Sequence, residues 1–388
     1  MSGGAYLRAA RHATRVQFFC SGFLFATWGV HIPSVRAQYG ANEAELGLAM
    51  LAAGVGALIG LTQAGRLTGR YGPARVTQIG GPIMALGIAL LLALPSYAAL
   101  LALLVVFGFF NSVFDVAINA EASELERLGG RPLMSGMHGM FSAGGMAGAT
   151  VGGLLLAWPQ RHLALVAVLM AAAALLAARR MLPAPPPGQA GEGSGGFKLP
   201  RGMLLVLGLL AGIGLIAEGA MYDWSVLYLQ QELGSPQHQA AFAYASFSAA
   251  MALTRFGGDW VRARVAPAVL LRGSALLAAA AMLLVLLTSN PWVALAGFAL
   301  VGVGFANVVP ILFSAAARLP GTSPAHAIAA VSSLGYLGFM AGPPVIGLLA
   351  QGSSLTAALY LVVGFAVVLA WSARRALGGL SADGAAPE

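Results

Sequence analysis

Long apolar runs alternate along the chain with short polar segments. About 20 apolar residues cross a bilayer as a helix, and this length predicts helices at twelve places. They cover residues 16–33, 46–64, 76–94, 99–123, 133–157, 163–181, 202–226, 240–258, 267–288, 292–314, 327–350 and 355–373. The first run lacks a small-residue cleavage site, so we expect a retained helix and not a signal peptide. The predicted fold class is an all-α membrane protein with twelve transmembrane helices.

Composition supports the membrane assignment. Hydrophobic residues make up 59% of the 388 positions and charged residues 9%, which excludes a soluble globular protein of this length. The single cysteine, Cys20, excludes an internal disulfide, and its place in an apolar run predicts a core thiol.

The basic residues predict the orientation. With the N-terminus inside, all of the 21 Lys and Arg residues except Arg36 and Arg161 lie in cytoplasmic loops or at cytoplasmic helix ends. This asymmetry is the positive-inside bias, and it predicts a bacterial inner-membrane protein with both termini in the cytoplasm. The net charge of +8 is thereby explained without a nucleic-acid partner.

A polar segment divides the chain. Residues 183–198 read "PAPPPGQAGEGSGGFK", a composition typical of a flexible linker. We therefore predict a six-helix bundle at 1–182, a cytoplasmic linker at 183–200 and a second six-helix bundle at 201–388.

The two predicted bundles repeat each other. "MAGATVGGLL" at 146–155 and "MAGPPVIGLL" at 340–349 match at seven of ten positions, and "GFFN" ending at Asn111 matches "GFAN" ending at Asn307. Parallel six-helix repeats are typical of one large class of transporters.

An acidic residue interrupts the fourth apolar run. Asn111, Asp115 and Asn119 recur every four residues and share a helix face spanning about 80°. An ionised side chain at the bilayer centre costs about 2.5–3.5 kcal/mol, so this face must meet water and partners inside the bundle. Asp115 is then a proton carrier, with Asn119 as its partner and Asn111 and Asn119 as cavity donors, or else a structural acid bonded to neighbouring helices.

Glu218 is a second intramembrane acid, within the seventh run. Gly212, Gly214 and Gly219 surround it and predict an interrupted helix beside a cavity, where transporters place binding groups. We interpret Glu218 as a coupling or substrate-binding acid, the alternative being a structural pair with a hydroxyl, and Asp223 as interfacial.

Three glutamates near the end of the fourth run have a different interpretation. Glu121, Glu124 and Glu126 lie close to Arg127 and Arg131. Clustered charges at helix ends are usually solvated, so we expect an interfacial charge network beside Arg70.

Further polar and aromatic residues are candidates for a substrate cavity. His138 is a proton shuttle or a packing residue. Trp28 and Trp224 occupy corresponding places in the two halves and either stack on a solute or anchor in the interfacial belt. Asn307 and Tyr336 are expected hydrogen-bonding groups of the second half.

Two groups of residues resemble motifs of the major facilitator superfamily. The first is the loop "GRLTGRYG", in which Gly65, Arg70 and Gly72 match and Gly69 replaces the usual acid; Arg264 keeps the corresponding place in the second half. The second is "GGMAGATVGG" in the fifth run, repeated in the eleventh. The resemblance covers essentially the whole chain and implies two pseudo-symmetric six-helix halves.

The glycines of the second motif are expected to be packing residues. Small residues let membrane helices approach closely, and we interpret these glycines as surfaces along which the halves rock during transport. They are Gly144, Gly148 and Gly152 in the fifth run, and Gly338 and Gly342 in the eleventh.

Within the superfamily, Asp115 followed by Asn119 resembles the fucose-permease branch, which implies a sugar-like solute and proton coupling. "AINAEASELER", "MHGMFSAGG" and "EGAMYDW" are similar to the YbjJ-like inner-membrane proteins. Two alternatives stay open: drug/proton antiport, which the absent fourth-helix arginine motif disfavours, and a membrane-embedded enzyme or sensor.

The expected partners are a small molecule, the bilayer and a coupling proton. Signatures for metals and nucleotides are absent from the sequence, so we expect a transporter without metal or cofactor. We also expect it to be a monomer. The named pocket residues include no basic group to hold an anion, which favours a neutral solute.

Overall fold

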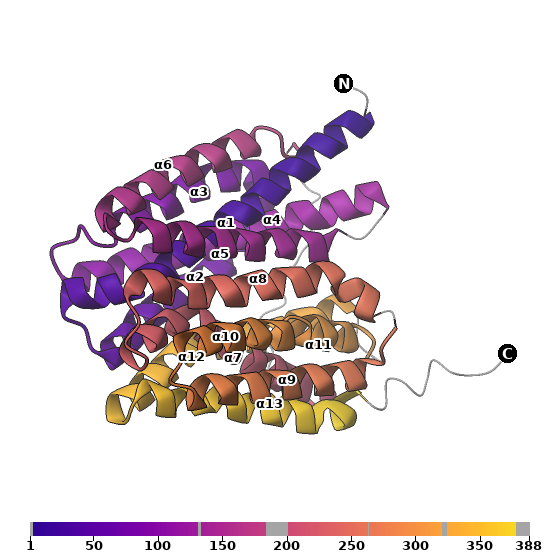
Figure 1. The fold of residues 1–388 in the computed structure, drawn as a ribbon. Coiled ribbons are helices and arrows are strands. Elements are labelled where there is room, and N and C mark those ends of the chain that lie inside the picture. Colours follow the sequence, from indigo (N-terminus) through magenta and orange to yellow (C-terminus); the bar gives the residue numbers. More distant parts are fainter. Residues whose placement is uncertain (1–2, 131–132, 184–200, 263, 320–323, 378–388) are drawn as a thin grey trace.

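The computed structural model describes residues 3–130, 133–183, 201–262, 264–319 and 324–377. These residues form thirteen helices (Figure 1). They are α1 (Gly3–Tyr39), α2 (Glu43–Tyr71), α3 (Pro73–Leu90), α4 (Tyr97–Gly129), α5 (Met134–Leu155), α6 (Pro159–Ala178), α7 (Met203–Gln231), α8 (Gln237–Arg262), α9 (Pro267–Leu287), α10 (Pro291–Phe305), α11 (Val308–Ala317), α12 (Pro324–Gly352) and α13 (Leu355–Leu377). Of the predicted linker at 183–200, only residue 183 lies within the described residues.

The twelve predicted membrane helices are confirmed, because α10 and α11 together make one pass. Nine spans of the described chain are long and apolar enough to cross a membrane, and one of them joins α10 to α11 as Pro291–Ala317. The helices α3, α5 and α8 complete the set with 18, 22 and 26 residues.

Local sequence places the helix starts. The Asn42 side chain accepts a hydrogen bond from the Glu45 backbone N–H at 2.9 Å, and the Asn42 backbone N–H donates to Glu45 at 2.8 Å, so the two residues form a capping box at the start of α2. Proline occupies the first turn of α3, α6, α9 and α10, where its missing N–H leaves no intrahelical bond unmade. Gly72, with φ +79°, makes the tight corner between α2 and α3.

The interrupted helix lies in a different place from the one predicted. α7 runs without a break through its glycines, whereas the tenth pass breaks at Ala306 and Asn307. Pro310 explains the break, because it has no N–H to bond the carbonyl of Ala306 and its ring crowds that carbonyl.

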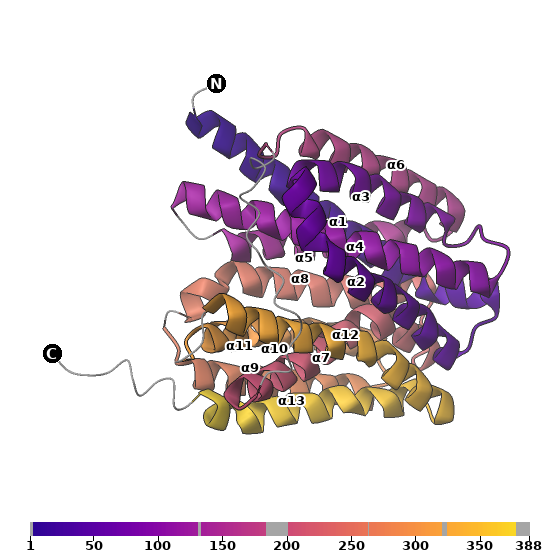
Figure 2. The same cartoon turned by 180° about the vertical axis from the view of Figure 1, so that it is seen from behind.

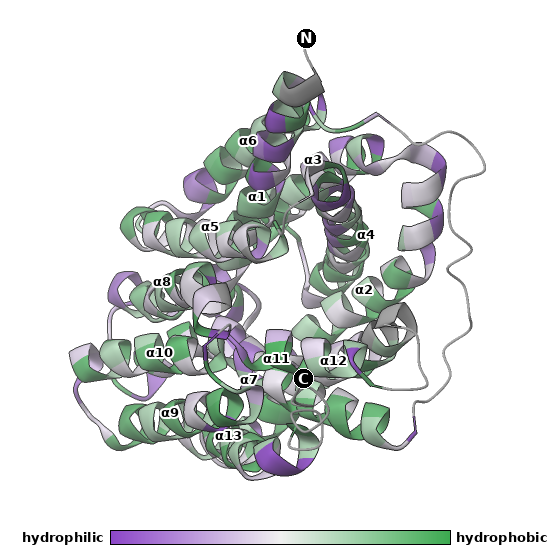
Figure 3. Cartoon of the chain, turned by 90° about the vertical axis from the view of Figure 1, so that its right-hand side faces the viewer, coloured by the Kyte–Doolittle hydropathy of each residue, from purple (hydrophilic) through white to green (hydrophobic). Residues whose placement is uncertain are grey.

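Helices α1–α6 form one half of the bundle and α7–α13 the other, as the back view also shows (Figures 1 and 2). α1 begins and α13 ends at the same end of the bundle, which we call the terminal end; the opposite end is the far end. Seen from the terminal end, α1, α2, α4 and α5 face α7, α8, α11 and α12 (Figure 3). The main contacts between the halves join α5 to α8 and α2 to α12.

The motif glycines pack helices within each half, so their interpretation as a moving seam is wrong. A Cβ atom at Gly144 would overlap the Phe19 carbonyl oxygen of α1, and one at Gly148 would lie 2.6 Å from that of Phe23. Gly152 likewise faces Val30 of α1. In the second half, Gly338 lies against Gly212 of α7, and Gly342 against Ile216.

Other glycines line the contact between the halves. A Cβ atom at Gly153 of α5 would lie 3.0 Å from the His238 carbonyl oxygen of α8, and one at Gly347 of α12 would lie 3.2 Å from Gly47 of α2. Gly152 and Gly153 are neighbours in the chain but contact different halves, because neighbouring residues on a helix face different partners.

Candidate functional site

Asp115 lies in α4 where the two halves meet. The Asn119 side chain donates to the Asp115 carboxylate at 3.1 Å and to its backbone carbonyl at 2.8 Å. Tyr336 of α12 donates its hydroxyl to the other carboxylate oxygen at 3.4 Å. The Asp115 carboxylate therefore connects the two halves directly.

The surroundings of Asp115 are accessible. Tyr336 is 41% exposed although it faces the opposite half, and Asn111 is half-buried one turn before Asp115. Neither side chain is sealed in the core, which is consistent with the polar face predicted for the fourth run.

Glu218 also lies near the other half, beside the contact of α8 with α5, but it has a charged partner. Arg255 of α8 donates one terminal nitrogen, Nη2, to both Glu218 oxygens, at 3.0 and 3.3 Å. Its other terminal nitrogen donates to the Ser142 hydroxyl of α5 at 3.3 Å. The ion pair belongs to the second half, and Ser142 extends it to the first.

Sequence reasoning missed Arg255, which it assigned to a cytoplasmic helix end. α8 continues to Arg262, so Arg255 lies two turns inside the helix, and its side chain is only 14% exposed. The expectation of a neutral solute therefore rested on a set of pocket residues that did not include Arg255. The signal available was a lone arginine inside an apolar run, in "MALTRFGG".

A cluster of aromatic side chains lies beside the ion pair. The Tyr222 ring lies one turn after Glu218 and meets Phe25 of α1 edge-on at 5.9 Å and Tyr244 of α8 at 5.0 Å. Phe25 in turn contacts Phe141 of α5 at 6.3 Å. Rings from both halves therefore form a wall beside the charged pair.

Trp28 and Trp224 are core residues. They are 6% and 0% exposed, so neither anchors in an interfacial belt, and that interpretation is wrong. Asp223 is 5% exposed and is likewise not interfacial. α7 is buried on all sides over this stretch, which explains why its polar residues are enclosed.

His138 and Asn307 lie on helices that border the interior. His138 is exposed, and its ring meets Phe18 of α1 edge-on at 5.4 Å. Asn307 lies at the break between α10 and α11 and is 5% exposed, and its side-chain amide oxygen faces Gly258 of α8. Asn307 thus packs the broken helix against α8.

The three glutamates of α4 separate into different roles. Glu124 pairs with Arg127 on the surface, and Glu126 accepts bonds from the backbone N–H groups of Leu133 and Met134. Glu121 is 1% exposed and accepts a bond from the Leu182 backbone N–H at 2.6 Å. Its predicted place in an interfacial charge network is therefore wrong, and Arg131 lies outside the described residues.

The residues of the loop motif lie at the terminal end. Arg70 stacks over the Tyr71 ring, and Arg264 stacks at 4.1 Å over the Trp260 ring and donates to its carbonyl. A Cβ atom at Gly65 would meet open space. These stacked arginines lie outside the Asp115 and Glu218 sites.

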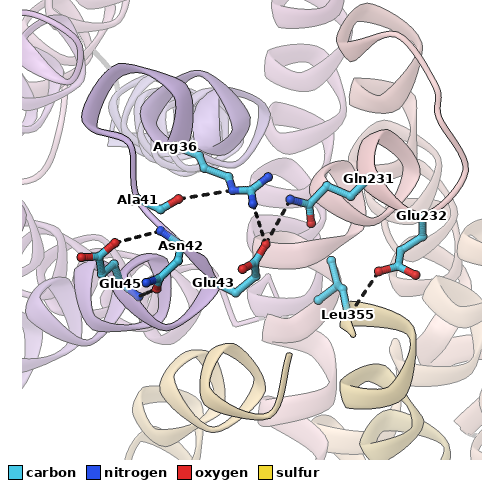
Figure 4. A network of polar contacts seen from close by, with 8 residues as sticks. All are labelled: Arg36, Ala41, Asn42, Glu43, Glu45, Gln231, Glu232 and Leu355. Atoms are coloured by element: carbon cyan, nitrogen blue, oxygen red, sulfur yellow. Dashed lines mark hydrogen bonds and ion pairs between the residues drawn. The ribbon is translucent and has the colours of Figure 1, made fainter. Parts of the chain in front are cut away.

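Polar bonds join the halves at the far end. Glu43 at the start of α2 accepts from Arg36 at 2.8 Å and from Gln231 of α7 at 3.1 Å (Figure 4). Gln237 of α8 donates to the Ser34 hydroxyl at 2.8 Å. Any motion that separates the halves at this end must break these bonds.

A buried histidine pair supports this end of the first half. His31 Nε2 of α1 and His162 Nδ1 of α6 are 2.9 Å apart, and both rings are essentially unexposed. His31 also bonds Ser34 at 3.3 Å, so the pair positions the hydroxyl that Gln237 reaches. Sequence reasoning missed this pair because its members are far apart in the chain.

Comparison with known proteins decides the family. The family model described as "Major Facilitator Superfamily" matches residues 16–343. The chain belongs to the major facilitator superfamily. An uncharacterised MFS-type transporter of Yersinia pestis is 36% identical over 93% of this chain and 94% of its own length. The membrane protein MosC of Rhizobium meliloti is 32% identical over 92% of this chain and 88% of its own length.

Solved structures of the superfamily have the same fold. A point mutant of the nucleoside transporter NupG superposes with a TM-score of 0.76 at 15% identity, covering 96% of this chain and 99% of that chain. A D-xylose-proton symporter superposes with a TM-score of 0.75 at 14% identity, covering 95% of this chain and 97% of the symporter chain. The relatives and the fold identify a membrane transporter and not an enzyme.

Proposed function

We propose that this chain is a monomeric secondary transporter that moves a small polar organic solute by alternating access and couples that movement to protons. The observation that carries the proposal is the position of Asp115, an acid inside the membrane bundle that bonds to Asn119 within its own half and to Tyr336 across to the other.

This geometry links proton binding to the relative position of the halves. Separation of α4 from α12 removes the Tyr336 hydroxyl from the Asp115 carboxylate. The ionised form then loses a hydrogen bond that stabilises it, and proton uptake compensates for that loss. A carboxyl group whose partners change between two states is suited to carry a proton across.

The resemblance of Asp115 and Asn119 to the fucose-permease branch supports a hydroxylated, sugar-like solute. The further similarity to the YbjJ-like proteins narrows the branch without naming a solute. The argument for an uncharged solute no longer holds, because Arg255 supplies the basic group that the sequence reasoning did not find.

Solute flux into proteoliposomes tests the function. We expect an imposed pH gradient to drive accumulation of a solute from a panel of sugars, polyols and sugar acids, with an upper limit of about tenfold per pH unit for one coupled proton. Protein-free liposomes and liposomes without a gradient are the controls. Equal uptake with and without the gradient would contradict proton coupling.

We also propose that both termini lie in the cytoplasm of an inner-membrane protein. Cys20 is 1% exposed, so a cysteine introduced at a surface position is expected to be the dominant labelled site. An impermeant maleimide applied to intact cells is expected to label Ala37→Cys at the far end and to spare Arg180→Cys at the terminal end. Labelling of Arg180→Cys with Ala37→Cys spared would show that the far end faces the cytoplasm and would contradict the proposed orientation.

A further inference from the structure

The Arg255–Glu218 ion pair is the most enclosed of the three ion pairs in the described part of the chain. Its side chains are 14% and 10% exposed, compared with 36% and 18% for Arg36–Glu43 and 69% and 42% for Arg127–Glu124. Desolvation makes an enclosed pair a poor source of stability, and apolar residues of similar volume are often as good or better. The pair therefore needs a role beyond holding α7 to α8.

The geometry of the pair leaves part of the guanidinium available. Both Glu218 oxygens approach the same nitrogen, Nη2, and Nη1 is 3.3 Å from the neutral Ser142 hydroxyl. The strongest arginine–carboxylate arrangement instead uses two parallel N–H bonds from two nitrogens. A second carboxylate can make that arrangement when Glu218 no longer holds the charge.

We propose that Arg255 binds the carboxylate of the transported solute, and that Glu218 competes for Arg255 and takes up a proton when the solute displaces it. The proposal deepens the proposed function and rests on it, because it names the substrate class as a small organic monocarboxylate. One proton on Glu218 and one negative charge on the solute leave the charge of the site unchanged.

The neighbouring side chains suit such a solute. Phe25 and Phe141 from the first half and Tyr222 from the second form an aromatic wall beside the pair. This wall can cover the uncharged body of the solute while Arg255 holds its carboxylate. Ser142 lies on the other half from Arg255, so a carboxylate bound at Nη1 contacts both halves at once.

Matched ligands test the carboxylate. Binding to the purified full chain is measured by calorimetry with D-gluconate against D-glucitol, L-lactate against propane-1,2-diol, and benzoate against benzyl alcohol; inorganic phosphate serves as a different anion. We expect at least one carboxylate to bind about tenfold or more tightly than its alcohol, a difference of about 1.4 kcal/mol. Equal binding within every pair, or binding of phosphate alone, overturns the proposal.

Variants assign that binding to the pair. Arg255→Gln is expected to remove the preference for the carboxylate, whereas Glu218→Gln keeps it. The double variant Glu218→Gln with Arg255→Gln leaves no uncompensated buried charge and protects the test against misfolding; it too should lose the preference. Arg264→Gln, at the exposed arginine stacked on Trp260, is the matched control. A folded double variant that still prefers the carboxylate contradicts the assignment.

The competition has its own signature. Because one proton binds with each solute molecule, wild-type affinity is expected to rise by up to about tenfold per unit fall in pH, and Glu218→Gln to lose that dependence. The titratable groups that interact electrostatically with the pair are His138 of α5, Tyr222 of α7 and Tyr244 of α8. His138→Gln therefore accompanies the series, and a pH dependence lost in that variant but kept in Glu218→Gln would contradict the competition.

The outcomes separate the two proposals. Proton-driven flux of an uncharged solute, with no carboxylate preference, leaves the transport function in place and removes the carboxylate site. Carboxylate binding that depends on Arg255, without proton-driven flux, supports the carboxylate site and contradicts the proposed proton-coupled transport.

Discussion

Asp115→Asn is expected to lower the pH-gradient-driven accumulation of an uncharged solute to the level reached without a gradient, because such a solute leaves Glu218 paired with Arg255. Asparagine nearly keeps the shape and the hydrogen bonds to Asn119 and Tyr336, but it cannot bind and release a proton. Exchange of solute across the membrane without a gradient is expected to continue, because the cavity is preserved. The measurement is solute flux in proteoliposomes, with and without an imposed pH gradient.

Two further variants separate proton coupling from a structural role. Asp115→Glu keeps the acid and moves it by one methylene, so partial coupling with a shifted pH optimum is expected. Tyr336→Phe removes only the hydroxyl that reaches Asp115, and coupling is expected to weaken without disappearing. A structural Asp115 gives the opposite order, with asparagine tolerated and glutamate disruptive. Full accumulation by Asp115→Asn would remove Asp115 from the mechanism.

Among the motif glycines, Gly144 is the position where substitution by leucine is expected to damage folding most. A Cβ atom at this position would overlap the Phe19 backbone carbonyl, so α1 and α5 must move apart. Overpacking costs about 1–3 kcal/mol and sometimes more, and we expect folded yield in detergent to fall by roughly fivefold or more. Size-exclusion chromatography and thermal unfolding measure the loss.

Two leucine variants serve as controls for that loss. Gly273→Leu introduces the same side chain where a Cβ atom would meet nothing within 4 Å, and its yield is expected to stay near wild type. Gly153→Leu lies between the halves, against His238, and is expected to lower flux more than yield. Normal yield with slow transport for Gly144→Leu would restore the moving-seam interpretation of the motif.

Part of the Asp115 site follows from the sequence because its geometry is local. A spacing of four residues places Asp115 and Asn119 one turn apart on any α-helix, and they are bonded in the structure. The prediction that Tyr336 faces the interior came from its place in the second half, but its contact with Asp115 depends on how α4 and α12 pack.

The charged pair required the tertiary structure. Arg255 and Glu218 lie on different helices, and a positive-inside count assigns a lone arginine near a helix end to the cytoplasm. Only the full length of α8 and its packing on α7 bring Arg255 to Glu218. The aromatic wall has the same origin, since Phe25 and Tyr222 come from different halves.

The sequence by itself determined the class of protein, the twelve passes and the family, because hydrophobic length and motif spacing are properties of a continuous stretch of chain. The tertiary structure decided the direction in which each helix face points. Packing placed Gly144 and Gly148 against α1 and enclosed Trp224 in the core. It also buried Glu121, which accepts a hydrogen bond from the Leu182 backbone N–H. Helix periodicity shows which residues share a face, whereas the partner of that face is set by packing between helices distant in the chain.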